Sequence, residues 1–284
     1  MDRIVSMENF RKTRLVRYLS LLLVVILCSP PPAYAKKKGG PYTVSARAAI
    51  FSNSTDVVRY YGKNVHTRVV PASTVKVMTA LIVLDRLPLN KVVTTSARAT
   101  YPQPSKIYAK AGERFRVRDL LYALMLKSAN DVSVILAEAV AGSEEKFVEL
   151  MNQKARELGA KHTCFANPHG LPSKAKQYTT PYDMYLIFRA ALKNDFFRQL
   201  VGTKSRTIYS LEGRKIPLKS HNKILFMDWK KKLHGKTGYT KEAKACFVGY
   251  LKKGKSICII AVFGCTRRWD DIKYIVERYG GIDL

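Results

Sequence analysis

The chain has 284 residues, of which 47% are hydrophobic, and this is enough for one sizeable domain with its own core. Its 50 lysines and arginines outnumber its 21 acidic residues, so the formal net charge is +29. Because the basic residues are scattered, without an aromatic-interleaved motif or a known binding signature, the composition argues against a nucleic-acid partner.

The first 35 residues have the pattern of an export signal. Four basic side chains come first, at Arg11, Lys12, Arg14 and Arg17. An uncharged, mostly apolar run follows at 18–28, and Ala-Tyr-Ala at 33–35 fits a small-residue cleavage site. Because the apolar run is too short to span a bilayer comfortably, we expect export and cleavage after Ala35, with an uncleaved N-terminal anchor as the alternative.

Export changes the interpretation of the charge. Removing the first 35 residues takes away five basic and two acidic side chains and leaves a formal charge of +26. Such a charge favours an anionic cell envelope as a partner, which would attract the protein through a long-range field that salt screens. The alternative is a surface whose charge serves only solubility.

The cysteines left after cleavage are Cys164, Cys246, Cys258 and Cys265. An oxidising exterior would allow up to two disulfides between them. Taking residues 253–254 as a hairpin turn places Cys246 opposite Ala261 rather than a cysteine, so buried free thiols suit the sequence at least as well as bridges. No CxxC motif and no ligand-spaced group of histidines occurs, and we therefore expect neither a metal site nor a cofactor.

After a basic linker at 36–44, the chain is predicted to begin with a hairpin and a helix. Apolar runs at 46–51 and 57–61 flank a polar turn, as in two paired strands. The apolar run that follows Ser73 has the period of a helix.

The middle of the chain is predicted to be helical, and its end to return to strands. The hydrophobic period at 119–159 is that of a helix, and Thr-Pro at 180–181 suits the start of another. Two almost continuous apolar runs within 245–263 predict strands covered on both faces, and a last helix ends at 280–281. Strands at both ends of a helical middle predict an α+β sheet domain with a helical insertion.

Ser73 and Lys76, in the segment PASTVKVMTA, make an unusual start for a helix. A serine there is often only an N-cap, but a lysine in the first turn faces the positive end of the helix dipole. Residues three apart share a helix face, so the two side chains can meet, and a neutral lysine can serve as base for a serine. The same spacing recurs at 143/146, 173/176 and 220/223, so it does not establish catalysis by itself. Ser143, which is followed by two acidic residues, is predicted to be an ordinary helix N-cap.

Two further motifs follow in order. KSANDV places Ser128 and Asn130 at the start of a predicted helix, where Asn130 or Asp131 could simply be the N-cap. HGKTGYT, which alone would be a turn before an apolar strand, contributes Lys236, Thr237 and Gly238. The order S-x-x-K, S-x-N, K-T-G is the signature shared by penicillin-binding proteins and serine β-lactamases.

From about residue 45 to 281 the chain resembles the low-molecular-weight D-alanyl-D-alanine carboxypeptidases. The resemblance is carried by PASTVKVMTALIVLD, LLYALMLKSANDVSVILAE, FVELMNQKARELGAKHTCFANPHGLP and KTGYTKEA. It implies a β-lactamase/transpeptidase-like α+β fold, an antiparallel sheet flanked by helices, with one catalytic domain at 45–284 and a mostly helical subdomain at about 100–200. The chain departs from many members at 233–234, where they carry Asp-Gly, and we expect no β-rich second domain after the last helix.

The resemblance implies cleavage of the terminal D-alanine from peptidoglycan stem peptides, with β-lactams as inhibitors, at an exported site associated with the cell wall. Ser73 would attack the peptide carbonyl and form an acyl-enzyme, and Lys76 would take its proton. Ser128, with Lys236 near it, would relay the proton to the leaving D-alanine. The catalytic residues are thus expected to be Ser73, Lys76 and Ser128.

Substrate binding is assigned to residues of the second and third motifs. The backbone N–H groups of Ser73 and Tyr239 would form an oxyanion hole, and Asn130 would hold the amide backbone of the substrate. Arg267 or Arg268 could join the site for the terminal carboxylate. The expected substrate-binding residues are Asn130, Lys236, Thr237, Gly238 and Tyr239, with Gly235 and Gly238 allowing the substrate to approach the strand.

Three other functions remain open. A β-lactamase with these motifs needs an E-x-x-L-N stretch after S-x-N, whereas here Glu149 stands too close to Asn152 in an amphipathic segment. A non-catalytic wall-binding protein would not need the intact catalytic positions. A D,D-endopeptidase that cuts cross-links uses the same motifs, so the sequence does not distinguish it from a carboxypeptidase.

Overall fold

The computed structural model describes residues 42–54 and 59–284, and Thr43–Leu284 form one compact unit. The predicted export signal at 1–35 and most of the predicted linker at 36–44 lie outside the described residues. In the described part of the chain, no helix is long and apolar enough to cross a membrane.

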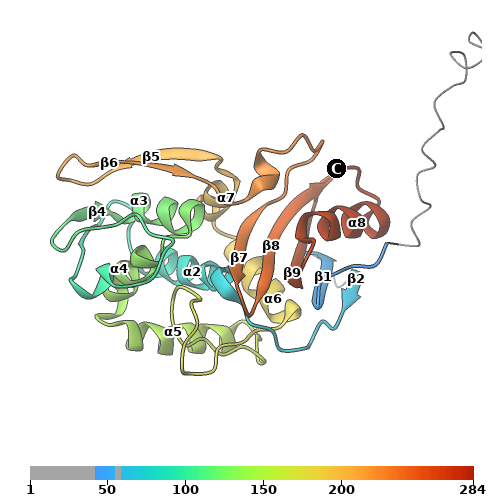
Figure 1. The fold of residues 1–284 in the computed structure, drawn as a ribbon, viewed down its shortest axis with the longest axis horizontal. Helices are drawn as coiled ribbons and strands as arrows, with labels where there is room; N and C mark the ends of the chain where they lie inside the picture. Colours follow the sequence, from blue (N-terminus) through green and yellow to red (C-terminus); the bar gives the residue numbers. More distant parts are fainter. Residues whose placement is uncertain (1–41, 55–58) are drawn as a thin grey trace, which may run out of the picture. The chain divides into compact units, whose positions relative to one another are not determined.

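A five-stranded antiparallel sheet in the order β2-β1-β9-β8-β7 forms the centre of this unit (Figure 1). Its strands are β1 (Ala48–Asn53), β2 (Arg59–Lys63), β7 (His234–Thr240), β8 (Lys244–Lys253) and β9 (Ser256–Cys265). The predicted N-terminal hairpin is confirmed as β1–β2, and the two apolar runs near the end are the central strands β8 and β9. The predicted α+β class is therefore confirmed.

The sheet is covered on both faces, which explains the continuous apolar runs. Alternate residues of β9 (Ile259, Ala261 and Phe263) belong to the main hydrophobic core, with side chains of α2 (Lys76–Arg86) and α6 (Pro181–Ala191). The intervening residues of β9 are buried too. On the other face, Phe51 of β1 lies against Gly280 of α8 (Arg268–Gly280).

The turn between β8 and β9 corrects the predicted register. Lys253 pairs with Ser256, so the two-residue turn is Gly254-Lys255, one residue later than predicted. Gly254 takes φ +59, which a tight hairpin turn favours. Ala261 consequently pairs with Val248, and Cys246 lies at an irregularity of the ladder instead of opposite Ala261. The four described cysteines are free thiols, which was one of the two expectations, the other being disulfides.

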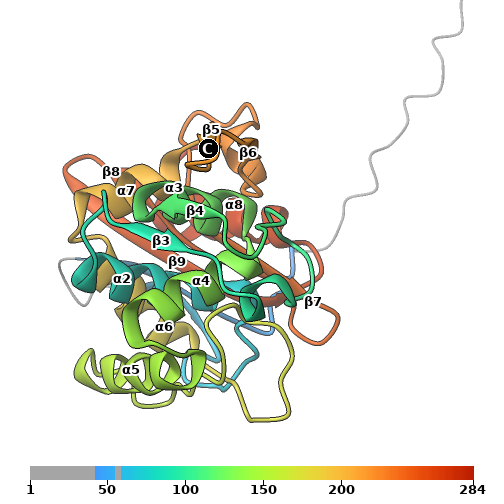
Figure 2. The ribbon, with the colours of Figure 1, turned by 90° about the vertical axis from the view of Figure 1, so that its left-hand side faces the viewer.

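The remaining helices form a layer beside the sheet, on the side away from α8 (Figures 1 and 2). They are α3 (Val117–Tyr122), α4 (Asn130–Ala141), α5 (Glu144–Glu157) and α7 (Asp195–Gly202). Short turns of helix occur at η1 (Ala72–Val75), η2 (Arg98–Thr100), η3 (Ala123–Lys127) and η4 (Lys223–Leu225). Ser143 and Thr180 cap α5 and α6 through their hydroxyls, which confirms both predicted helix starts.

Two small hairpins in this region were not predicted. They pair β3 (Val92–Thr94) with β4 (Arg114–Arg116), and β5 (Ser205–Tyr209) with β6 (Lys215–Lys219). In both views β5 and β6 lie at the top of the molecule, far from α5 (Figures 1 and 2). Each strand has only three to five residues, which is too short for the apolar alternation by which a strand is recognised.

Candidate active site

The first motif lies at the entry to α2, where Ser73 belongs to the short turn η1 and Lys76 is the first residue of the helix. The hydroxyl of Ser73 caps neither element, so the simple N-cap interpretation is wrong. Lys76 is fully buried, and its Nζ lies 3.2 Å from Oγ of Ser73. The same Nζ donates to Oδ1 of Asn130 at 2.7 Å and to the backbone oxygen of His169 at 2.6 Å.

The second motif lies at a break between two helices. Ser128 has left-handed backbone angles (φ +58) and separates the π-helical turn η3 from α4, which begins at Asn130. The side chain of Asn130 is oriented from both ends, because its Nδ2 donates to the backbone oxygen of Gln103 at 2.7 Å. The backbone oxygen of Gln103 can only accept a hydrogen bond, so it must face the NH2 group of the Asn130 side chain. The amide oxygen Oδ1 is therefore the atom that faces Lys76.

The third motif lies on the edge strand β7. Lys236 is buried, and its Nζ donates to Oγ of Ser128 at 2.9 Å and to the backbone oxygen of Thr237 at 2.8 Å. Gly238 faces η1, because a β-carbon at this position would lie 3.1 Å from the backbone nitrogen of Ser73. The side chain of Tyr239 is exposed.

Gly235 departs from its expected role. A β-carbon there would lie 2.2 Å from the backbone oxygen of Val248 and close to the ring of Phe247, both on β8. The requirement for glycine at Gly235 therefore comes from packing within the sheet and not from the approach of a substrate.

A cleft of about 270 Å³ lies where the three motifs meet. Six of the eight predicted site residues line it: Ser73, Ser128, Asn130, Thr237, Gly238 and Tyr239. The other two, Lys76 and Lys236, are buried and reach the cleft through their hydrogen bonds to Ser73 and Ser128. The structure thus brings these eight predicted residues together.

Burial determines the electrostatics of the two lysines. Loss of hydration lowers the pKa of Lys76 well below the ordinary value, Lys236 lowers it further, and Asp131 acts in the opposite direction. Burial, together with the charge of Arg268, lowers the pKa of Lys236 to about 7. Both amines are therefore far easier to deprotonate than exposed lysines, which titrate near pH ~10.4.

Two further titratable residues, Arg268 and His221, line the cleft. Arg268 donates to the backbone oxygens of Gly238 (3.2 Å) and Cys246 (2.9 Å), whereas Arg267 donates to that of Thr43. Of the two candidate arginines, Arg268 is thus the one at the site. His221 also lines the cleft, and burial, followed by the charge of Lys236, lowers its pKa to about 4, so its ring is neutral at physiological pH.

The loop at 167–171 also belongs to this site, and the sequence did not predict its part. Its residue His169 supplies the carbonyl that receives Lys76, and Gly170 lines the cleft. Gly170 has φ +85, and a β-carbon on it would lie 2.0 Å from the backbone oxygen of Ala72, so only glycine allows the loop to approach η1. The segment Asn-Pro-His-Gly carries the turn-forming residue types, which was the available signal.

Asp131 is a second feature that the sequence did not reveal. Its buried carboxylate accepts hydrogen bonds from the backbone N–H groups of Ile107, Ala109 and Val132. It thereby holds the segment after Pro104 and Ser105, two residues of the cleft wall, against the start of α4. Among the described residues, no group of three or more His, Cys, Asp or Glu side chains could hold a metal ion.

Comparisons with known proteins agree with this geometry. Residues 35–267 match the model of a peptidase family described as D-alanyl-D-alanine carboxypeptidase. The chain is 37% identical over 212 residues to D-alanyl-D-alanine carboxypeptidase DacF of Bacillus subtilis, covering 72% of this chain and 54% of that protein. It is 35% identical over 193 residues to DacB2 of Mycobacterium tuberculosis, covering 68% of this chain and 65% of that protein. The chain thus spans between half and two thirds of the length of these relatives.

A solved structure shows the same fold. The crystal structure of the Streptomyces K15 DD-transpeptidase superposes with a TM-score of 0.79 at 29% identity, covering 86% of this chain and all of that one. The sheet flanked by helices is therefore an architecture already known from experiment.

Proposed function

Since this chain belongs to the D-alanyl-D-alanine carboxypeptidase family, we propose that it is a serine D-Ala-D-Ala carboxypeptidase that acts on peptidoglycan stem peptides through an acyl-enzyme on Ser73. The observation that carries the proposal is the environment of the Lys76 amine. A buried amine with a lowered pKa, 3.2 Å from a serine hydroxyl, is the arrangement that activates a serine nucleophile.

The hydrogen bonds of Lys76 determine where its lone pair points. A neutral amine has two N–H donors and one lone pair. The carbonyl of His169 and Oδ1 of Asn130 can only accept, so they take the two donors. The lone pair is then left for the hydroxyl of Ser73, which can give up its proton to Nζ as its oxygen attacks the carbonyl carbon of the substrate.

The later steps use the groups around the Ser73 hydroxyl. The backbone N–H groups of Ser73 and Tyr239 would stabilise the oxyanion of the tetrahedral intermediate, since Gly238 brings the two elements together. When the C–N bond breaks, the leaving amine of D-alanine needs a proton, and Ser128, hydrogen-bonded to Lys236, is placed to deliver it. Water then hydrolyses the acyl ester and restores Ser73.

The positive groups of the cleft suit the terminal carboxylate of the substrate. The cation Lys236 and the hydroxyl of Thr237 lie on β7, and the second cation, Arg268 at the start of α8, donates to the backbone oxygen of Gly238 on the same strand. Asn130 has fewer hydrogen-bonding groups available for the substrate than the sequence suggested. Oδ1 and one N–H of its amide are used by Lys76 and Gln103, so only the second N–H would reach the substrate.

The β-lactamase alternative loses support in the structure. Glu149 and Asn152 lie on α5, and Asn152 bonds in both directions with the backbone of Phe165. Neither residue lines the cleft. Asn152 therefore anchors a loop, and the carboxylate of Glu149 is not placed to activate a deacylating water in the cleft.

The test is release of D-alanine from a synthetic peptide ending in D-Ala-D-Ala, together with covalent labelling by a fluorescent penicillin. We expect both reactions for the unmodified protein and neither for Ser73→Ala. A protein that is labelled and cuts cross-linked peptidoglycan fragments into uncross-linked ones, without releasing D-alanine from the synthetic peptide, would be the endopeptidase instead. Absence of labelling in a folded protein would contradict the proposal and favour a non-catalytic wall-binding protein.

We also propose that the protein is exported and works at the cell wall, in the periplasm or outside the cell. The export pattern of the first 35 residues and the peptidoglycan substrate of the proposed reaction support this location. Mass spectrometry of the secreted protein should find a chain that begins at Lys36. Recovery of the complete chain from the membrane fraction would contradict cleavage.

A further inference from the structure

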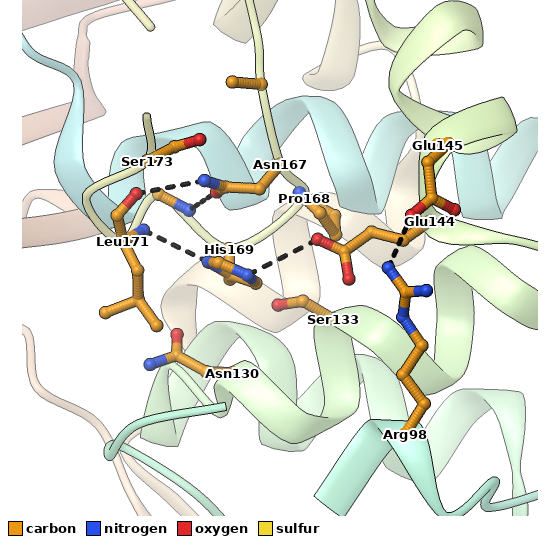
Figure 3. Close-up of polar contacts among 12 residues, drawn as sticks. Arg98, Asn130, Ser133, Glu144, Glu145, Asn167, Pro168, His169, Leu171 and Ser173 are labelled. Carbon is orange, nitrogen blue, oxygen red and sulfur yellow. Dashed lines mark hydrogen bonds and ion pairs between the residues drawn. The ribbon is translucent and has the colours of Figure 1, made fainter. Parts of the chain in front are cut away.

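A polar network behind the wall of the cleft has no role in the mechanism above (Figure 3). At its centre is the side chain of His169, which is only 11% exposed and does not line the cleft. Nδ1 of this ring accepts a hydrogen bond from the backbone N–H of Leu171 at 3.1 Å. Nε2 lies 3.6 Å from Oε1 of Glu144, the first residue of α5, whose side chain is 17% exposed.

These two contacts determine the protonation of the ring. The N–H of Leu171 is a donor, so Nδ1 must be the nitrogen without a proton. A neutral ring then carries its proton on Nε2, which faces the carboxylate of Glu144. Burial lowers the pKa of His169, Glu144 opposes this shift and Lys76 reinforces it, so the neutral ring is favoured at physiological pH.

The same residue holds the base of the proposed reaction. The backbone oxygen of His169 accepts from Nζ of Lys76 at 2.6 Å, the shortest of the three contacts of that amine. The rotation of this carbonyl depends on the loop backbone on both sides of it. The ring fixes the side towards Leu171, and Thr79 fixes the other by donating to the backbone oxygen of Pro168 at 2.7 Å.

We infer that Glu144 is a positioning residue for Lys76, acting through the ring of His169. The carboxylate holds Nε2–H, the ring holds the N–H of Leu171, and the carbonyl of His169 is thereby kept pointing at the amine. The inference rests on the proposed function, in which Lys76 is the base. Loss of Glu144 leaves the ring free to turn, which loosens the acceptor that directs the lone pair of Lys76 towards Ser73.

The chain offers a matched control in the next residue. Glu145 is also an acid in the first turn of α5, so it has a similar favourable interaction with the helix dipole. Its side chain is 64% exposed and pairs with Arg98 on the surface, with no contact to the ring of His169 (Figure 3). Comparing substitutions at the two positions separates an effect on the ring from an effect on the helix.

The experiment measures acylation of the full chain by a fluorescent penicillin at several concentrations, which separates the acylation rate constant from the binding constant. Glu144→Ala should lower the rate constant by about tenfold or more, part of the ~10²–10⁴-fold that a general base contributes. The binding constant should hardly change, because neither Glu144 nor the ring lines the cleft. Glu144→Gln should keep most of the rate, since its amide oxygen can accept from Nε2–H, and Glu145→Ala should match the unmodified protein.

Several results would overturn the inference. One is an equal rate constant for Glu144→Ala and Glu145→Ala; another is weaker binding with an unchanged rate constant. Ring-nitrogen NMR of the unmodified protein provides a test that needs no variant at Glu144, with His169→Gln used only to assign the signal. A proton found on Nδ1 of His169 would contradict the inference even if Glu144→Ala fails to fold. Absence of labelling in the unmodified protein, by contrast, would overturn the proposed function and this inference with it.

Discussion

The single residue on which the proposed reaction depends most is Lys76, whose amine must be neutral to accept a proton. Arginine keeps the positive charge but does not deprotonate in the working range. Lys76→Arg should therefore reduce penicillin acylation by about 10²–10⁴-fold while the protein stays folded. Lys236→Arg should be milder, because Lys236 presents charge to a carboxylate. The labelling rate at neutral pH, with Ser73→Ala as blank, measures both, and near-normal labelling of Lys76→Arg would remove Lys76 as the base.

The lowered pKa values of the two lysines predict a bell-shaped pH dependence of acylation. As the pH falls through the pKa of Lys76, its amine becomes protonated and the rate falls. As the pH rises above the pKa of Lys236, about 7 in the free protein, the positive charge that attracts the ligand carboxylate is lost. Lys236→Arg should abolish the alkaline fall and leave the acid limb in place. A profile that stays bell-shaped in this variant would show that another group causes the alkaline limb.

At the scale of the elements, the loop at 167–171 depends on one glycine. Gly170→Ala places a β-carbon 2.0 Å from the backbone oxygen of Ala72 and must separate the loop from η1. We expect a loss of at least about tenfold in acylation, since His169 then moves away from Lys76. Gly213→Ala is the control, because Gly213 also has φ +85 but nothing lies within 4 Å of its added carbon. It should lower only the thermal stability, and a similar loss of acylation in both variants would contradict the explanation.

The elements also show what the sequence could and could not predict. The strands β8 and β9, the hairpin β1–β2 and the caps at Ser143 and Thr180 were predicted because each has a strong local signal. The helical period at 119–159 did not by itself show its breaks at Ser128 and Gly142, where the backbone turns left-handed, although local motifs predicted helix starts beside both. Serine rarely adopts that conformation, and tertiary contacts impose it at Ser128.

The residues of the site were predicted more completely than their surroundings. Ser73, Lys76 and Lys236 stand in motifs with fixed spacing, and serine and lysine side chains in those motifs point to catalysis by a serine nucleophile. The carbonyl of His169 and the carboxylate of Glu144 carry no such mark, because their roles arise from contacts between segments far apart in the sequence. A backbone acceptor in particular has no preferred residue type, so only the folded structure reveals it.

At the scale of the whole molecule, the net charge predicts how the protein is retained at its substrate. If the positive charge concentrates the protein on an anionic envelope polymer, binding to isolated cell walls should weaken steeply as salt rises above physiological strength. Sedimentation of the protein with purified walls at increasing salt measures this. Ser73→Ala should behave in the same way, because the attraction does not involve the acyl-enzyme. Retention that does not respond to salt would mean that the charge serves only solubility.

The burial of Lys236 also affects the free energy of unfolding. In the unfolded chain this lysine titrates near pH ~10.4, whereas in the folded protein its pKa is about 7, so the unfolded state binds more protons between these values. Stability is therefore lost as the pH falls through this window, and at neutral pH most of the loss is present. Lys236→Met should raise the unfolding temperature and abolish activity, whereas the exposed Lys252→Met should change neither; a lower unfolding temperature for Lys236→Met would contradict this. A screen for thermostable variants that ignored activity would therefore select against a lysine on which the proposed reaction depends.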